Sequence, residues 1–414
     1  MITGVPTMAD ILRDKGYATH AVGKWHLGFC NQEYLPTSRG FDHHYGFWNG
    51  AQDYFSHIVQ HGYDFRDDER VLLKDRGTYS TELFQKRALR IIRTHKKTKP
   101  LFLYLPFQSV HAPLQVPEVY KDMYANTTGD VNRATLLGMV TAMDDAVGNI
   151  TAVLKKKGMF ENTLMVFLSD NGAPVANSGS NWPLRGSKHT LFEGGTRVPA
   201  FVSGLGLEPR VESRLFHISD WLPTILTAVN PKNHMDNVDG MSHWKALVNK
   251  SSSWSRSEIL YNIDNFRSDH ETPISAIRVG DWKYIWREKG SWQGWYLPSE
   301  LNLTLQESDA WKGYIWKEQD FHSKGGNRDH IWNGWMQHPK NNKTRRKKKM
   351  IQNLLFNLAT DPLERANVAE ANPEKVAELE ERIREHNRTM IIINGTVPEI
   401  SGTPINRVWG TGWC

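Results

Sequence analysis

The sequence predicts an α/β domain with a mostly parallel sheet flanked by helices, followed by a smaller α+β domain. Three short apolar runs, at residues 18–22, 100–105 and 163–168, are typical of buried strands. Helical periodicity lies between these runs, and such alternation of strands and helices indicates a parallel sheet. Beyond about residue 256 the pattern changes to short strands joined by a hairpin signal, which indicates an antiparallel sheet.

Hydrophobic spacing predicts the helices of the first domain. Residues 8–15 and 81–94 are expected to be helical, and the clearest pattern runs from residue 136 to 154 with apolar side chains at steps of three and four. Asp144 and Asp145 fall within this last helix. Adjacent positions diverge by about 100° around a helix, so we interpret the pair as structural and not as a dinuclear metal site.

The second domain, residues 256–414 after a first domain of residues 1–255, is predicted to contain an antiparallel sheet and one helix. Its strands are expected at residues 259–263, 275–279, 282–286 and 354–358. A charged helix is expected over residues 374–388, because the preceding Pro373 suits a first helical turn.

Length and composition exclude a disordered chain and a small domain that depends on disulfides or a metal for its stability. The chain has 414 residues, a formal net charge of +6 and 39% hydrophobic residues. No apolar run approaches the roughly 20 residues that span a bilayer, so no membrane span is expected. The two cysteines, Cys30 and Cys414, are too few for a disulfide framework to be read from the sequence, so the redox compartment stays open.

Sequons suggest passage through the secretory pathway, although the first residues do not resemble a signal peptide. Random placement of this composition would give roughly three sequons. The chain has seven Asn-x-Ser/Thr sequons, at Asn126, Asn149, Asn249, Asn302, Asn342, Asn387 and Asn394.

Polar loops follow the three predicted strands of the first domain. The first loop holds Lys24 and His26, the second holds His111, and the third holds Asp170 and Asn171. Ligands of open α/β sheets bind outside the carboxyl ends of the strands, so we expect these side chains to converge on one edge of the sheet.

These residue types suit an anionic substrate and a hard cation, although each has an alternative explanation. Asp170 and Asn171 are oxygen donors that suit Ca²⁺ or Mg²⁺ better than zinc, whereas Asn171 with Gly172 could also form an Asx turn. Lys24 offers a charge to anions, and the two histidines offer acid, base or donor chemistry, unless they are ordinary surface or core residues. Lys188, in a later loop rich in glycine, offers another anion contact or belongs to a solvated basic loop.

Five motifs together resemble the type I sulfatases, and their order and spacing match that family over nearly the whole chain outside residues 287–350. The motifs are Gly23–Gly28, Gln108–Pro117, Ser169–Gly172, Asn181–Pro199 and Ile218–Thr224. Within the family the resemblance is greatest to the arylsulfatase B (N-acetylgalactosamine-4-sulfatase) branch, through Leu114–Pro117 and Val408–Gly410 among others.

The resemblance implies an alkaline-phosphatase-like α/β domain with one Ca²⁺ per site. It also implies a formylglycine, made from cysteine or serine, whose hydrate attacks sulfur. By motif, the residues carried over are Asp170 and Asn171 as metal ligands, Lys24 and Lys188 as catalytic residues that hold sulfate, His26 as the residue that orients formylglycine, and His111 as the acid facing the substrate's leaving group.

One departure from the family pattern concerns the nucleophile. Family members carry an Asp-Asp pair and a Cys/Ser-x-Pro-Ser-Arg segment ahead of the part that matches, and this sequence has neither. We therefore expect the polypeptide as given to be N-terminally truncated and inactive. Its full-length form is expected to be a lysosomal or secreted hydrolase of sulfated glycans such as N-acetylgalactosamine 4-sulfate units.

Two other function classes stay open. A non-catalytic protein could bind sulfated glycans through the basic tract 343–349 and the tryptophans of the insertion 287–350, unless the tract is a solvated loop and the tryptophans are core residues. A phosphoesterase of the same superfold is less favoured, because its two-metal set of His and Asp ligands is not seen. No nucleic-acid partner is expected.

Overall fold

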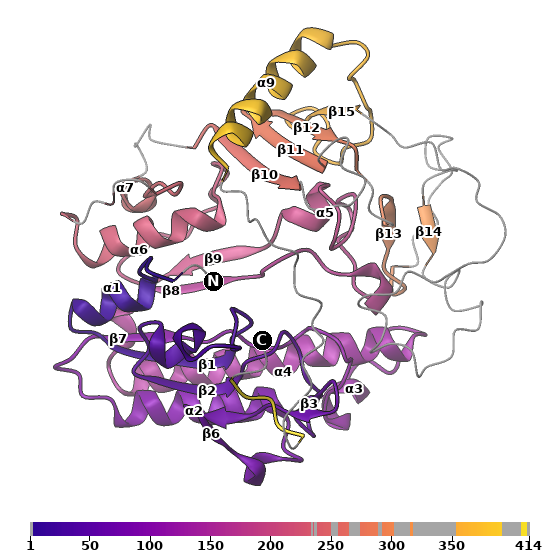
Figure 1. The fold of residues 1–414 in the computed structure, drawn as a ribbon. Coiled ribbons are helices and arrows are strands. Elements are labelled where there is room, and N and C mark those ends of the chain that lie inside the picture. The colour runs from indigo at the N-terminus through magenta and orange to yellow at the C-terminus, as the bar shows by residue number, and fades with distance from the viewer. Residues whose placement is uncertain are drawn as a thin grey trace. The chain divides into compact units, whose positions relative to one another are not determined.

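A computed structural model describes most of the first 300 residues and part of the remainder (Figure 1). The described residues are 3–232, 235, 238–249, 256–264, 274–288, 292–301, 315–317, 353–390 and 407–411. Contacts divide the chain into two compact units, of which the first is Met1–Thr163 with Gly395–Cys414 and the second is Leu164–Asn394. The domain boundary predicted between residues 255 and 256 stays a prediction.

The first unit is built on a five-stranded sheet with the order β6-β5-β2-β1-β7. Its strands are β1 (Ala18–Lys24), β2 (His43–Phe47), β5 (Arg66–Asp67), β6 (Arg70–Val71) and β7 (Leu101–Tyr104). Strand β1 pairs in parallel with both β2 and β7, while β5 and β6 add an antiparallel edge. The strands predicted at residues 18–22 and 100–105 are therefore confirmed. A short hairpin of β3 (Ile58–Val59) and β4 (Gly62–Tyr63) lies outside this sheet.

Among the described residues of this unit, four α-helices accompany the sheet, and the predicted ones are confirmed. They are α1 (Met8–Asp14), α2 (Ser80–Thr94), α3 (Glu118–Asp122) and α4 (Val131–Lys156). Helix α1 begins at a capping box in which Thr7 and Asp10 satisfy each other's backbone N–H groups. Helix α2 packs against both the sheet and α4 (Figure 1). Its buried face carries apolar residues at helical spacing, among them Leu83, Phe84 and Ile91.

Helix α4 confirms that Asp144 and Asp145 lie in the middle of a helix. Both side chains are exposed in the middle of the helix, and the Tyr120 hydroxyl donates a hydrogen bond of 3.0 Å to Asp145. The helix ends just before Gly158, whose φ of +63° is readily adopted by glycine. The carboxylates therefore belong to a solvent-facing helix surface.

Aromatic side chains fill part of the first unit's core. Trp25, Phe29, Trp48 and Trp409 are buried in one cluster. The Trp409 indole N–H donates to the carbonyl of Val59 at 2.8 Å, which ties this late part of the chain to the hairpin.

Cys30 lies in a disulfide.

The second unit begins with a strand that the sequence predicted. Strand β8 (Met165–Leu168) exists where residues 163–168 predict it, but it pairs with β9 (Ala200–Ser203) in an antiparallel sheet of two strands. A four-residue apolar run indicates a strand without indicating its partner, which lies about 30 residues further along the chain. The strand predicted at residues 163–168 is therefore confirmed, and its antiparallel pairing with β9 is a finding of the structure.

The smaller antiparallel sheet of the second unit is confirmed. Its order is β10-β11-β12-β15, with strands β10 (Glu258–Asp264), β11 (Ile274–Val279), β12 (Trp282–Trp286) and β15 (Asn353–Asn357). Helix α9 (Pro373–Thr389) begins at the expected proline and packs on β10 and β11 (Figure 1). Further elements of this unit are α5 (Glu193–Thr196), α6 (Trp221–Val229), α7 (Trp244–Val248), β13 (Trp295–Leu297) and β14 (Ile315–Lys317).

The insertion is described only in part. Trp295 is 4% exposed and donates to the carbonyl of Leu363 at 2.9 Å, so core packing explains this tryptophan better than sugar stacking does. The basic tract 343–349 lies outside the described residues. Within the described part of the chain, no helix combines the length and apolar character needed to cross a membrane.

Candidate active site

The end of β1 places Lys24 and His26 between two neighbouring segments of the first unit. The Lys24 N–H donates to the carbonyl of Pro106 at 2.9 Å, just beyond β7. Two residues later, the His26 N–H donates to the carbonyl of Trp48 at 3.0 Å, just beyond β2. The loop after β1 therefore continues the parallel pairing of the sheet on both sides.

His26 has a strained backbone and little room around its ring. Its φ of +54° lies in the left-handed region, which costs a residue other than glycine about 1–3 kcal/mol. A Cβ atom on Gly50 would lie 2.6 Å from Nε2 of His26, and the other ring atoms are almost as close. Glycine at this position lets the backbone approach the Nε2 end of the imidazole closely.

His111, after β7, is held through its backbone and one ring nitrogen. Its carbonyl accepts a hydrogen bond of 2.9 Å from the Tyr54 hydroxyl. Its Nδ1 lies 2.8 Å from the carbonyl of Ala112, and because a carbonyl oxygen can only accept, Nδ1 is the donor. This hydrogen bond fixes Nδ1 as a donor and orients the imidazole.

A segment that the sequence did not single out brings these two histidines together. Residues 50–54 contact the ring of His26 at one end and the carbonyl of His111 at the other. Within the segment, the carbonyl of Gln52 accepts a hydrogen bond of 2.5 Å from Gln108. These contacts join positions 56 and 57 residues apart, so no local pattern could have revealed them.

In the second unit, Asp170 and Asn171 follow β8 directly, in a tight loop. The Ser169 hydroxyl donates to the carbonyl of Asn171 at 2.9 Å, and the Asn171 side-chain amide donates to the carbonyl of Gly172 at 3.1 Å. The Gly172 N–H then donates to the carbonyl of Gly195 at 3.0 Å. The Asn171 side chain thus acts as a donor, which is not the pattern of the Asx-turn alternative.

Ala173 links this loop to the segment that carries Lys188. Its N–H donates to Oδ1 of Asn181 at 2.7 Å, and its carbonyl accepts from Nδ2 of Asn181 at 2.8 Å. The same carbonyl accepts a hydrogen bond of 3.3 Å from the Lys188 backbone N–H. Lys188 is therefore tethered three positions from Asp170, and the second unit brings Asp170, Asn171 and Lys188 together.

The donor set of Asp170 and Asn171 fits a hard cation. Asp170 is exposed, and among the described residues no hydrogen bond or ion pair engages its carboxylate or Oδ1 of Asn171. The pair would supply two of the roughly six to eight oxygen ligands that Ca²⁺ takes. The described ranges contain no group of three or more His, Cys, Asp and Glu side chains placed to hold a metal.

The six candidate residues thus form two groups, one in each unit. Lys24, His26 and His111 lie in the first unit, and Asp170, Asn171 and Lys188 lie in the second. The sequence prediction that all six converge on one edge stays a prediction. Each group has the chemistry expected of it: a lysine with two histidines in the first, and a lysine with two oxygen donors in the second.

Comparison with known proteins gives a family match and similar full-length relatives. A family model described as Sulfatase matches residues 2–231. Arylsulfatase J of Mus musculus is 34% identical over 415 residues, covering 98% of this chain and 66% of that protein. N-acetylgalactosamine-6-sulfatase of Rattus norvegicus is 30% identical over 313 residues, covering 70% of this chain and 56% of that protein. The chain thus spans less than two thirds of the length of either relative.

Solved structures show the same fold at low identity. The crystal structure of Ps i-CgsB in complex with k-i-k-neocarrahexaose matches with a TM-score of 0.67 and 23% identity, covering 92% of this chain and 73% of that one. The structure of BT4656 in complex with its substrate D-glucosamine-2-N,6-O-disulfate matches with a TM-score of 0.58 and 15% identity, covering 93% of this chain and 82% of that one. The predicted alkaline-phosphatase-like α/β fold with a smaller antiparallel sheet is confirmed.

Proposed function

The chain belongs to the sulfatase family, and on that premise we propose that it forms part of a sulfuric ester hydrolase that acts on sulfated glycans. The observation that carries the proposal is the extent of the family match. The matched residues 2–231 include all six candidate residues, together with the backbone contacts that hold His26, His111 and Lys188.

The proposed chemistry assigns a task to each group of residues. Lys24 and Lys188 place positive charge on the sulfate oxygens, where negative charge grows in the transition state. His111, with Nδ1 fixed as a donor, delivers a proton from Nε2 to the departing sugar oxygen. His26 orients the nucleophile. A Ca²⁺ ion held by Asp170 and Asn171 would add further positive charge when bound.

The nucleophile is not among these 414 residues by the family's motif, because no Cys/Ser-x-Pro-Ser-Arg segment occurs in the sequence. Covalent attack commonly accounts for a large part of a hydrolase's rate. We therefore propose that these 414 residues alone do not hydrolyse sulfate esters. Hydrolysis requires a form of the protein that also contains the formylglycine.

We propose N-acetylgalactosamine 4-sulfate units as the substrate, as the arylsulfatase B-like motifs Leu114–Pro117 and Val408–Gly410 suggest. The relative from Rattus norvegicus is named for the 6-sulfate of the same sugar, which supports the sugar without supporting the sulfate position. Substrates sulfated at position 4 and position 6 must therefore be compared directly.

We also propose that the protein is a glycoprotein of the lysosome or the extracellular space. Four of the seven sequon asparagines lie among the described residues, and all four are exposed. They are Asn126, Asn149, Asn249 and Asn387.

The test is an activity measurement on the protein as it occurs in its source. We expect release of inorganic sulfate from N-acetylgalactosamine 4-sulfate. The same form with His111→Ala or Lys188→Ala is expected to lose about 100-fold or more in kcat/KM, whereas Lys375→Met on the exposed face of α9 serves as a control without effect. Binding of sulfated glycans without any hydrolysis would refute the enzyme and favour the non-catalytic glycan-binding alternative.

A further inference from the structure

The loop that carries Lys188 is closed tightly on itself. At its base, the Gly194 N–H donates to the carbonyl of Arg185 at 2.6 Å. Inside it, the Thr190 N–H donates to the carbonyl of Ser187 at 3.0 Å, and the Ser187 N–H donates to the Thr190 hydroxyl at 3.2 Å. A Cβ atom on Gly194 would lie 2.5 Å from the Arg185 carbonyl oxygen, so only glycine permits this closure. The position of Lys188 is therefore set by where the two ends of the loop are held.

The first end of the loop is held through Arg185. This side chain is 8% exposed and donates from Nη1 to the carbonyl of Glu364 at 2.9 Å and from Nε to the carbonyl of Gln293 at 2.8 Å. Its guanidinium also stacks over the rings of Phe192 and Trp295, at 4.0 and 4.8 Å from their centroids. The residues that hold this end come mainly from more than 100 positions further along the chain.

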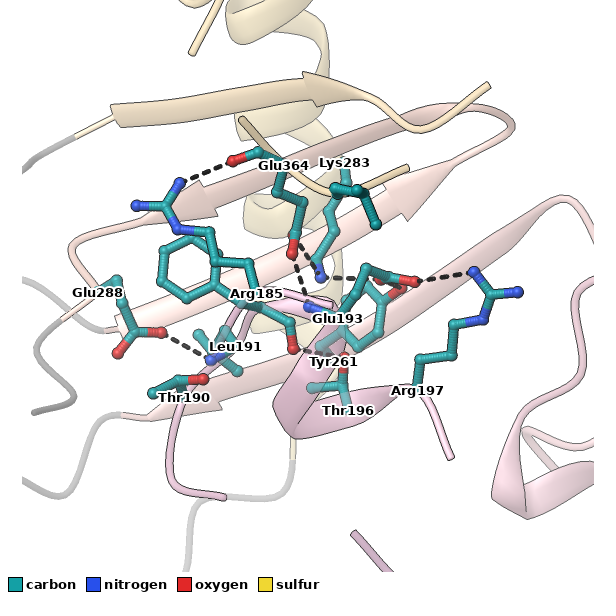
Figure 2. A network of polar contacts seen from close by, with 12 residues as sticks. Arg185, Thr190, Leu191, Glu193, Thr196, Arg197, Tyr261, Lys283, Glu288 and Glu364 are labelled. Atoms are coloured by element: carbon teal, nitrogen blue, oxygen red, sulfur yellow. Dashed lines mark hydrogen bonds and ion pairs between the residues drawn. The ribbon is translucent and has the colours of Figure 1, made fainter. Parts of the chain in front are cut away.

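The second end is held through Glu193, in a buried network of charges (Figure 2). Its carboxylate lies 2.9 Å from the ammonium of Lys283, and its backbone N–H donates to Glu364 at 2.7 Å. Lys283 also lies 2.9 Å from Glu364, and all three side chains are at most 3% exposed. The Tyr261 hydroxyl donates to Glu193 at 3.3 Å. One lysine on β12 thus binds both carboxylates that reach the loop's second end.

This network defines geometry more than it adds stability. Replacing a buried ion pair by well-packed apolar side chains is often neutral or stabilising, because desolvation offsets the charge attraction. Burial raises the pKa of Glu364 above its usual value, and the neighbouring carboxylate of Glu193 acts in the same direction, although the ammonium of Lys283 opposes the shift. What the charges do provide is direction, since the Lys283 ammonium lies 2.9 Å from one oxygen of Glu193 and 2.9 Å from one oxygen of Glu364.

We propose that Lys283 is a positioning residue of the active site, which acts through Glu193 and Glu364 to hold the loop that presents Lys188 to the sulfate group. The inference rests on the proposed function, because Lys188 has a sulfate to hold only if the chain is part of a sulfatase. It assigns the C-terminal sheet a part in the reaction, although none of its residues needs to touch the substrate.

The experiment is a double-mutant cycle between Lys283 and Lys188 in the active, formylglycine-containing form. Lys283→Met keeps the length and volume of the side chain and removes its charge. We expect it to lower kcat/KM by about 10- to 100-fold and to weaken inhibition by inorganic sulfate, because small displacements of a binding group have effects of this size. In the Lys188→Ala background the same change is expected to alter kcat/KM by less than about twofold, because the two residues act in series.

Additive losses in the cycle would overturn the inference, since they would mean that Lys283 supports the fold without acting through Lys188. The matched control is Lys375→Met, which removes an exposed ion pair with Glu378 in the same unit. If Lys283→Met does not accumulate as folded protein, the neutral variant Lys283→Met/Glu193→Gln/Glu364→Gln replaces it in the cycle. Wild-type kinetics in that neutral variant would also overturn the inference.

The two proposals fail in different ways. If the folded wild-type form releases no sulfate from any sulfated sugar, the proposed function is wrong. If the wild type is active but the cycle is additive, the proposed function stands and only the role of Lys283 is wrong.

Discussion

The buried histidine His44 predicts a specific loss of stability in mildly acidic solution. His44 lies on β2 and is 1% exposed, and burial lowers its pKa from 6.5 to about 4. Between these two values the unfolded chain binds a proton at this site and the folded chain does not. The contribution of neutral, buried His44 to the free energy of unfolding is therefore fully present above about pH 6.5 and is lost as the pH falls toward 4. Linkage over this interval gives a loss of about 2.5 kcal/mol between pH 7.5 and pH 4.5.

The assay compares wild type with His44→Gln, which cannot titrate, in urea unfolding followed by tryptophan fluorescence at pH 7.5, 6.5, 5.5 and 4.5. The variant is expected to be less stable than wild type at pH 7.5. The difference between their free energies of unfolding, called the gap here, is expected to shrink by about 2.5 kcal/mol at pH 4.5. Asn149→Gln, at an exposed position on α4 without a titratable group, is the control, and the difference between its free energy of unfolding and that of wild type should not change with pH. A gap for His44→Gln that stays constant across the series would refute the assignment of a depressed pKa to this buried ring.

Three further changes test other parts of the structure. Asp170→Ala is expected to reduce Ca²⁺ binding at least tenfold in isothermal titration while leaving the unfolding temperature in chelator unchanged, because the carboxylate is exposed. Gly50→Ala is expected to displace the ring of His26 and lower kcat by about 10-fold or more, with little change in circular dichroism. Asp220→Asn is expected to lower the free energy of unfolding by about 3–5 kcal/mol in urea titration, because it leaves the charge of Arg256 without its buried partner.

Patterns of neighbouring residues predicted those helices and strands whose formation depends on residues close together in the sequence. The helix over residues 131–156 follows from apolar spacing and ends at a glycine, and the strands over residues 274–279 and 282–286 follow from a turn signal between them. In each case the residues that determine the element lie within it or beside it. The loops that hold Lys24, His111 and Asp170 could be placed for the same reason, since each follows a predicted strand.

Contacts between distant parts of the chain could not be predicted in this way. The antiparallel partner of β8 lies about 30 residues away, and nothing in the four residues of either strand specifies the other. The ion pair of Glu193 with Lys283 joins positions 90 residues apart. A charged residue in a strand predicts exposure from sequence alone, so the burial of Lys283 appears only when the fold brings two carboxylates to it.

The most direct test of the sulfatase proposal is release of inorganic sulfate from N-acetylgalactosamine 4-sulfate by the protein isolated from its source. We predict turnover that depends on His111, whose Nδ1 is committed to the carbonyl of Ala112. Folded protein that releases no sulfate from this sugar, from its 6-sulfate or from a simple aryl sulfate would contradict the proposal.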